Sequence, residues 1–304
     1  MDLPNPPSSS PPAPRRARIL IGALLAVVLA YQWQQRSQSD PRSTRPRLVR
    51  VAQAAEAVGG TIDRGRFAQV LCERPLDALE WARANHLRNV ADYRCTFVKQ
   101  ELLFSGMSRE QIIDVRFRQQ PYSVMMHWVR NPDKAVRVIY VAGRWVDPQA
   151  ERLEERDLAV CQPGAIAQLF VRSIRQPIRG VRAREASRRP IDDFGFARSL
   201  ELIVEFSRKA EQNGHLDLRF AGEAEFDGRP VWKLERFLPN YGADGPYPDA
   251  SAVYFIDQEW LVPVAVYSFA DAGQSQMLGR YEYRDVRMNA GCGESDFDPA
   301  SYGM

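Results

Sequence analysis

The sequence predicts an α+β domain in which two helices alternate with two sets of antiparallel strands. Three observations predict this fold. Apolar residues recur at helical spacing from Pro75 to about Val90, and again in the segment that follows Arg189. From Tyr93 onward the apolar period changes to two, which is the period of a strand. The connections between the predicted strands are short, which is typical of an antiparallel meander.

The first 74 residues are predicted to lie outside this domain, which extends over residues 75–304. Residues 1–17 are rich in proline and serine, end in a basic cluster, and are predicted to be disordered. Residues 18–33 contain a short apolar run after that cluster, which is typical of a signal peptide or a signal-anchor helix. Residues 34–74 are polar and predict a tether, with a short helix at 51–58. The chain is therefore expected to be exported, and either to stay anchored by the segment at 18–33 or to be secreted after cleavage.

The first half of the domain begins with the helix at 75–90, whose proline suits a first helical turn. The strand that follows places Tyr93, Cys95 and Phe97 on one face. Further strands are predicted at 113–117, 122–129, 135–141 and, after Gly143, up to Val146. The strands at 122–129 and 135–141 are apolar on both faces. Something should therefore cover the sheet on each side, or these residues should line a cavity.

The middle of the chain predicts a helix at 165–174 and is then crowded with arginines up to Arg189. A solvated loop is the simple interpretation of Arg172–Arg189, and contact with phosphate head groups is the alternative. A second firm helix follows, with Asp192 or Asp193 as its N-cap and Asn213-Gly214 at its end.

The second set of strands continues to the C-terminus, and a hairpin turn at 226–229 joins the first two. The tail after residue 296 is predicted to be a strip that covers part of the domain. The remaining strands are predicted at 216–220, 231–238, 251–256, 262–270 and 277–288.

Composition and motifs exclude several classes of function. The net charge of +3 gives no field that would attract nucleic acid. The three histidines have no second histidine or cysteine at ligand spacing, so neither a metal nor another cofactor is expected. No nucleophile elbow, zinc-protease motif or glycine-rich phosphate loop occurs, so no catalytic residue is assigned and the protein is not expected to be an enzyme. The cysteines Cys72, Cys95, Cys161 and Cys292 permit two disulfides or four buried thiols.

Short motifs in a fixed order resemble those of the bacterial family DUF1571. Tyr93-x-x-x-Phe-Val-Lys-Gln-Glu101 and Pro121-Tyr-Ser-Val-Met-Met-His-Trp128 resemble the start of the family. Arg189-Pro-Ile191 before a helix resembles its middle motif, and Tyr281-x-Tyr-x-Asp-Val286 with Asp296-Phe-Asp-Pro299 resembles its end. The likeness spans roughly residues 76–304. The resemblance implies a LolA- or LppX-like fold, in which a curved antiparallel sheet forms an incomplete barrel that cups two main helices.

The same resemblance implies a location in the bacterial cell envelope, with the domain facing the periplasm and the anchor, if kept, in the inner membrane. It also implies that the cup holds lipid or lipoprotein acyl chains. Acyl chains bind through the apolar area that they bury, so large inward-facing side chains are the candidate ligand-binding residues. These are Phe97, Val124, Met126, Trp128, Trp232, Phe255 and Trp260. The expected partners are therefore such a lipid and the membrane that holds the N-terminal helix. A structural or scaffolding envelope protein, whose sheet docks another protein without ligand or catalysis, is the alternative.

Overall fold

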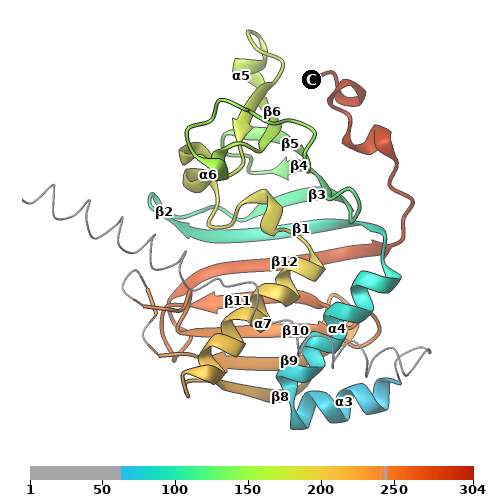
Figure 1. Cartoon of the computed structure of the whole chain (residues 1–304), viewed down its shortest axis with the longest axis vertical. Helices are drawn as coiled ribbons and strands as arrows, with labels where there is room; N and C mark the ends of the chain where they lie inside the picture. The colour runs from blue at the N-terminus through green and yellow to red at the C-terminus, as the bar shows by residue number, and fades with distance from the viewer. Residues whose placement is uncertain (1–62, 240, 243–244) are drawn as a thin grey trace, which may run out of the picture. The chain divides into compact units, whose positions relative to one another are not determined.

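The computed structural model describes residues 63–239, 241–242 and 245–304. Figure 1 shows a broad antiparallel sheet with helices packed on one of its faces. The predicted disordered segment, signal segment and helix at 51–58 lie outside the described residues. Within the described part, no helix is both long enough and apolar enough to cross a membrane.

Eleven strands follow one another in a single open sheet, in the order β7-β6-β5-β4-β3-β1-β12-β11-β10-β9-β8, and the short β2 pairs with β1. The predicted α+β class with an unclosed antiparallel sheet is confirmed. The strands are β1 (Asp92–Leu103), β2 (Gly106–Met107), β3 (Gln111–Arg118), β4 (Ser123–Arg130), β5 (Ala135–Val141), β6 (Leu158–Pro163), β7 (Ile174–Pro177), β8 (Asp217–Phe226), β9 (Arg229–Phe237), β10 (Ser251–Asp257), β11 (Pro263–Phe269) and β12 (Met277–Met288).

The two predicted sets of strands become one sheet through the pairing of β1 with β12. Phe97 faces Tyr283 across this seam, and Glu101 faces Gly279. Tyr93, Cys95 and Phe97 are all buried, so the predicted alternation of β1 is confirmed. We call the face of the sheet that carries these three residues the inner face and the opposite one the outer face.

Three helices cover part of the inner face. In Figure 1, α4 (Pro75–Asn89) and α7 (Phe196–Gln212) cross the half of the sheet between β12 and β8, and α3 (Arg64–Glu73) lies beside β8. The expected tether is therefore wrong for residues 64–73. Phe67 and Leu71 of α3 are fully buried in the main core, which adds a helix to the folded domain. These two apolar side chains lie one helical turn apart. A single repeat of that spacing is too short to predict a helix from the sequence.

Helix α7 begins later than expected. Neither Asp192 nor Asp193 caps it, because both belong to a separate 3-10 turn, η2 (Ile191–Asp193). The residue before α7 is Gly195, with φ of 103°. A Cβ there would lie 3.0 Å from Phe117 and 3.1 Å from the Tyr93 hydroxyl, so only glycine fits this close approach. Its end at Asn213-Gly214 is as predicted.

The segment between the two halves also differs from expectation. The predicted helix at 165–174 is reduced to one turn, α5 (Ala165–Gln168), and β7 begins at Ile174. The predicted strand ending at Val146 is a single bridge to Asp157. Residues in the arginine-rich stretch form β7 and the short helix α6 (Val181–Ala186), because their backbone groups find partners in β6 and in a helical turn.

The tail covers part of the domain, as predicted, and the structure places it on the outer face of β4 and β5. It forms two 3-10 turns, η3 (Glu294–Phe297) and η4 (Pro299–Tyr302). Phe297 is fully buried against Met125 and Ile139, which point to the outer face of β4 and β5. Asp296 pairs with Arg116 and, at 3.3 Å, with Arg94. The tail therefore explains why β4 and β5 are apolar on both faces.

A buried histidine on α4 should make the fold sensitive to acid. His86 is 1% exposed, packs edge-on against Phe196, and has no hydrogen-bond partner on either ring nitrogen among the described residues. Burial lowers the pKa of His86 to about 4, whereas the same histidine in the unfolded chain has a pKa of ~6.5. This lowered pKa leaves stability intact above pH ~6.5. Stability is lost as the pH falls toward 4, because only the unfolded chain binds the proton, for a total of about 3 kcal/mol.

We therefore expect His86→Leu to flatten the acid limb of stability. Urea denaturation at a series of pH values between 7 and 4 measures the free energy of unfolding of the two proteins. The readout is the slope with pH, because the substitution also changes packing. An equal slope in the two proteins over this range would contradict the assignment.

Candidate functional site

A cavity of about 510 Å³ lies on the inner face, beside the part that α7 covers. Its floor comes from the strands on both sides of the β1–β12 seam, and its walls come from α6, α7 and the segment between them. Leu202, Ile203 and Phe206 of α7 supply one apolar wall, and Ile178 and Phe194 contribute to the opposite one. Small-molecule sites typically occupy roughly 300–1,000 Å³ and are lined mainly by apolar groups.

Three of the predicted ligand-binding residues line this cavity. Phe97 of β1 and Met126 and Trp128 of β4 belong to its lining. They lie together because β3 alone separates β1 from β4, and because all three side chains point to the inner face. Phe97 is 5% exposed and Met126 is 9% exposed, whereas Trp128 is more accessible and donates through Nε1 to Gln111 at 3.0 Å.

The other four predicted residues lie outside the cavity lining. Val124 is fully buried in the core, and Trp232 is covered by α3, where it contacts Phe67 at a ring distance of 5.3 Å. Phe255 alternates with the lining residue Tyr254 and therefore lies on the outer face. Trp260 sits in a loop, with the Arg229 guanidinium 3.7 Å above its ring. The alternating pattern of a strand identifies its buried face. It does not show which residues of that face are covered by a helix and which border a cavity.

A buried polar cluster borders the cavity at the seam. Lys99 Nζ lies 2.9 Å from Glu101 Oε2 and 3.1 Å from Ser187 Oγ. Glu101 also accepts from the Tyr281 hydroxyl at 2.9 Å and from the backbone N–H of Arg188 at 3.3 Å. Burial alone would raise the pKa of Glu101, but Lys99 and the hydrogen bonds lower it below its usual value. The cluster is thus an ion pair with its acceptors satisfied, which ties β1 to the chain after α6.

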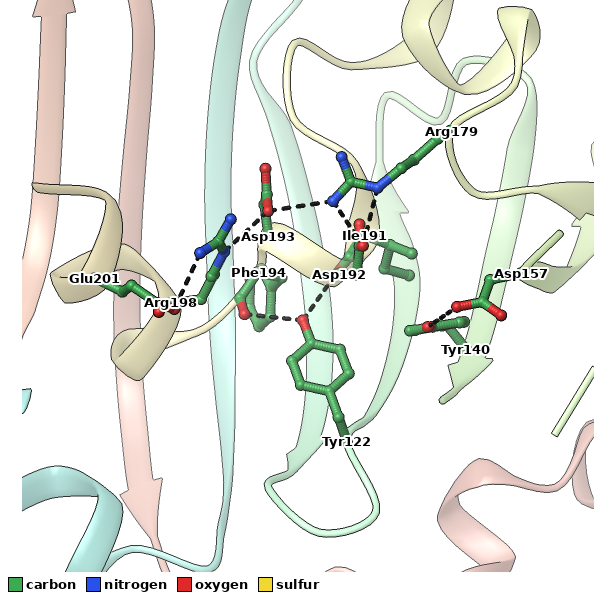
Figure 2. Close-up of polar contacts among 10 residues, drawn as sticks. All are labelled: Tyr122, Tyr140, Asp157, Arg179, Ile191, Asp192, Asp193, Phe194, Arg198 and Glu201. Carbon is green, nitrogen blue, oxygen red and sulfur yellow. Dashed lines mark hydrogen bonds and ion pairs between the residues drawn. The ribbon is translucent and has the colours of Figure 1, made fainter. Parts of the chain in front are cut away.

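The segment over the cavity, residues 178–194, is held by the contacts in Figure 2. Arg179 Nη2 lies 2.7 Å from Asp192, and Arg198 of α7 lies 3.0 Å from Asp193. The Tyr122 hydroxyl lies 2.8 Å from the Ile191 carbonyl oxygen and 2.9 Å from that of Phe194. Burial and the nearby Asp192 raise the pKa of Tyr122, so its hydroxyl keeps the proton that it donates. We call residues 178–194 the roof segment.

Two arginines of the roof segment line the cavity without an ion pair among the described residues: Arg182, which is exposed, and Arg189, which is half-buried. Arg189 lines the cavity, and among the described residues it makes neither an ion pair nor a side-chain hydrogen bond. It faces tyrosines on the floor: burial raises the pKa of Tyr281 and of Tyr283, and the Arg189 charge partly opposes both shifts. Arg236, in contrast, is paired with Asp249 at 3.1 Å and is 2% exposed. Of the two described lining arginines that are buried or half-buried, Arg236 has a carboxylate partner and Arg189 has none.

The sequence contained partial signals for these missed residues. Lys99, Glu101 and Tyr281 all lie within the motifs that resemble the family, and polar residues at inward positions of a strand need a partner. No pattern in the chain indicated which residues of the roof segment would meet them. Ser187 lies 86 residues after Glu101 along the chain, and only the fold brings the two together.

The chemistry that the site can perform is limited by its groups. No histidine belongs to the cavity lining. His86 is buried in α4, His215 lies 3.1 Å from the Tyr247 hydroxyl, and His127 lies on a different face from Met126. Across residues 63–304, apart from the three undescribed positions, no three histidine, cysteine or acidic side chains come together at metal-binding distance. All four cysteines are free thiols, and Cys95 and Cys292 are buried.

Comparisons with known proteins give one family and several solved structures. The family described as "Protein of unknown function (DUF1571)" matches residues 90–302. No curated protein matches the chain. Similar solved structures include MucB, at 14% identity and a TM-score of 0.42, which covers 79% of this chain and 63% of the MucB chain. This chain thus spans less than two thirds of MucB.

In two further comparisons, the match extends over nearly the whole length of the other protein. Lipoprotein LppX from Mycobacterium tuberculosis is 12% identical with a TM-score of 0.33, over 74% of this chain and 98% of LppX. A LolA superfamily protein from Nitrosomonas europaea is 10% identical with a TM-score of 0.23, over 71% of this chain and 94% of that protein.

The buried ion pair at the cavity gives a prediction about stability. Lys99→Met leaves the Glu101 carboxylate buried without its counter-charge, which should lower the free energy of unfolding by roughly 3–5 kcal/mol at pH 7. The unpaired carboxylate should then titrate above its unfolded pKa, because only hydrogen bonds, chiefly those from Tyr281 and Ser187, remain to oppose the effect of burial. A raised carboxyl pKa favours the folded state as the pH falls, so the deficit should shrink toward pH 5.

Chemical denaturation at pH 7 and pH 5 measures this deficit, with Lys134→Met as the matched control. Lys134 also pairs with a glutamate, Glu185, but both side chains are about half exposed, so its loss should matter little at either pH. A Lys99→Met deficit that is small, or that does not change with pH, would contradict the role given to the pair.

Proposed function

The chain belongs to the DUF1571 family, and from that premise we propose that its folded domain binds a hydrophobic ligand in the inner-face cavity. The ligand class is a lipid or the acyl chain of a lipoprotein. The observation that carries the proposal is a cavity of about 510 Å³ whose main walls are apolar side chains of β1, β4 and α7. Apolar walls favour a ligand that binds by burying area.

The composition of the walls suits an adaptable apolar ligand. Met126 and Phe206 contribute flexible or broad apolar surface, and a methionine can fit differing chain shapes without strain. The polar groups at the seam are mostly engaged with one another, so they do not require a polar ligand. Arg189 differs, because its charge faces the cavity without a partner among the described groups. The proposed ligand is therefore an amphiphile with an acidic or polar end near Arg189.

The proposed location follows from the N-terminal sequence. The basic cluster and the apolar run at 18–33 support export, and residues 34–62 then link the exported domain to the membrane or to a cleavage point. We propose a periplasm-facing envelope protein on this basis. We propose a role in binding, without catalysis, because the lining holds no histidine and its serine beside a base, Ser187, is engaged with the Lys99–Glu101 ion pair.

A protein-docking role is the second candidate, and one observation favours it. The sheet is open, so β7 and β8 each present an edge without a neighbouring strand in the described part of the chain. An extended segment of another protein can add to such an edge through backbone hydrogen bonds. This scaffold would need no occupant in the cavity, which separates it from the first proposal.

A cavity-filling substitution tests ligand binding. Leu202 on α7 lines the cavity, and Leu202→Trp should fill much of it and weaken capture of an acyl chain at least about tenfold. The full chain in membranes is treated with a photoreactive fatty acid, and the labelled peptides are identified by mass spectrometry. In the wild type, adducts should appear on the β1 and β4 peptides that carry Phe97, Met126 and Trp128.

The matched control is Leu87→Trp, which makes the same exchange on a helix but at a residue that is 37% exposed and outside the lining. It should label like the wild type. Equal labelling of the two variants would place the ligand outside the cavity. Absence of adducts on β1 and β4, together with stoichiometric recovery of a protein partner, would favour the scaffold instead.

A further inference from the structure

An apolar tip projects where β6 turns into β7. Residues 164–174, which we call the α5 tip, include Ile166, Leu169 and Phe170, with exposed fractions of 82%, 80% and 84%. Single exposed apolar side chains are common on protein surfaces, but three large ones within five residues form a contiguous patch. Figure 1 shows α5 at the end of the molecule beyond β6, away from α3, α4 and α7.

The α5 tip is a defined structure rather than an open loop. Backbone N–H groups of Phe170 and Val171 donate to the Ala167 carbonyl, at 3.1 and 3.0 Å. The Gln168 side chain donates to the Pro163 carbonyl at 2.7 Å, which fixes the turn to the end of β6. The apolar side chains are therefore presented outward by a short, internally bonded turn.

The chain that follows the exposed apolar residues of the α5 tip is rich in arginine. From Leu158 to Pro190 the chain carries seven arginines and one carboxylate, Glu185. Arg179 is paired with Asp192, and Arg184 lies 4.0 Å from Glu155. The other five make no ion pair with any described residue: Arg172, Arg175, Arg182, Arg188 and Arg189. Arg172 and Arg175 directly follow the exposed apolar residues and are exposed themselves, which matches a surface that offers phosphates above an apolar layer.

The same surface borders the cavity. Ile174 at the base of the α5 tip and Arg182 on α6 both line the cavity and are both exposed, so the cavity opens on this side. A bilayer that meets the α5 tip would therefore lie next to that opening. Acidic proteins would also be attracted by the arginines, but they would not account for the apolar side chains at the end of the tip.

We propose that the α5 tip is a membrane-docking element, which inserts Ile166, Leu169 and Phe170 among the head groups of an anionic phospholipid bilayer while Arg172 and Arg175 contact phosphates. This contact is separate from the predicted N-terminal anchor, because it is made by the folded domain. It also stands independently of what the cavity binds.

Hydrogen–deuterium exchange of the full chain tests this contact locally, whatever holds the N-terminus. The chain is reconstituted in vesicles of phosphatidylcholine alone or of phosphatidylcholine with phosphatidylglycerol. Amide exchange at 164–175 should slow in the anionic vesicles and remain fast in the neutral ones. Phe170→Ser should restore fast exchange by weakening insertion about tenfold or more. Arg172→Gln with Arg175→Gln should raise the phosphatidylglycerol fraction needed for protection several-fold.

The matched control is Phe104→Ser, which removes an apolar side chain that is 99% exposed on the β1–β2 turn. It should leave protection of the α5 tip unchanged, and Leu202→Trp should do so too, which separates this proposal from ligand binding. The side chains replaced at 104, 170, 172 and 175 are exposed and bury little apolar area, so these variants should unfold at the same temperature as the wild type. Equal exchange in the two kinds of vesicle, as expected of a tip that docks a protein, would overturn the proposal.

Discussion

An aromatic cluster at the β1–β12 seam is the contact on which the rest of the structure depends. The Tyr93 ring stacks on Phe117 of β3 at 4.7 Å, and Phe196, the first residue of α7, lies 4.7 Å from Tyr93 and 4.5 Å from Tyr283 of β12. One cluster therefore joins the two halves of the sheet and sets the start of the long helix. Gly195 permits this approach, because any side chain there would occupy the space of the rings.

The cavity follows from how this cluster places α7. Helices α3, α4 and α7 fill the inner face toward β8, and no helix of comparable length lies over β3–β6 in the described chain. That region is covered by the roof segment, whose ends pack through the buried Ile178 and Phe194 and which is otherwise held by ion pairs and by the Tyr122 hydroxyl. Directional contacts of this kind fix a segment at a distance without filling the space beneath it. Apolar strand residues such as Met126 thus border open volume on one side and core on the other.

The candidate site was predictable only in part, for a physical reason. Alternation placed Phe97, Met126 and Trp128 on the inner face correctly, because the two faces of a strand follow from its period. The same rule applied to Trp232 and Val124, yet α3 and the core bury them. Phe255 was assigned to the wrong face because its strand, β10, is apolar on both sides. The polar groups at the cavity came from motif positions whose partners lie far away in the chain.

By itself, the sequence determined the α+β class, the limits of α4, the run of antiparallel strands and the presence of a covering tail. These features depend on local periodicity, turn residues and caps, which neighbouring residues decide. The tertiary structure decided the pairing of β1 with β12, the inclusion of α3 in the core, the start of α7 at Gly195 and the place of the cavity. Each of these depends on which distant side chains compete for the same space, and such competition leaves no periodic trace in a single chain.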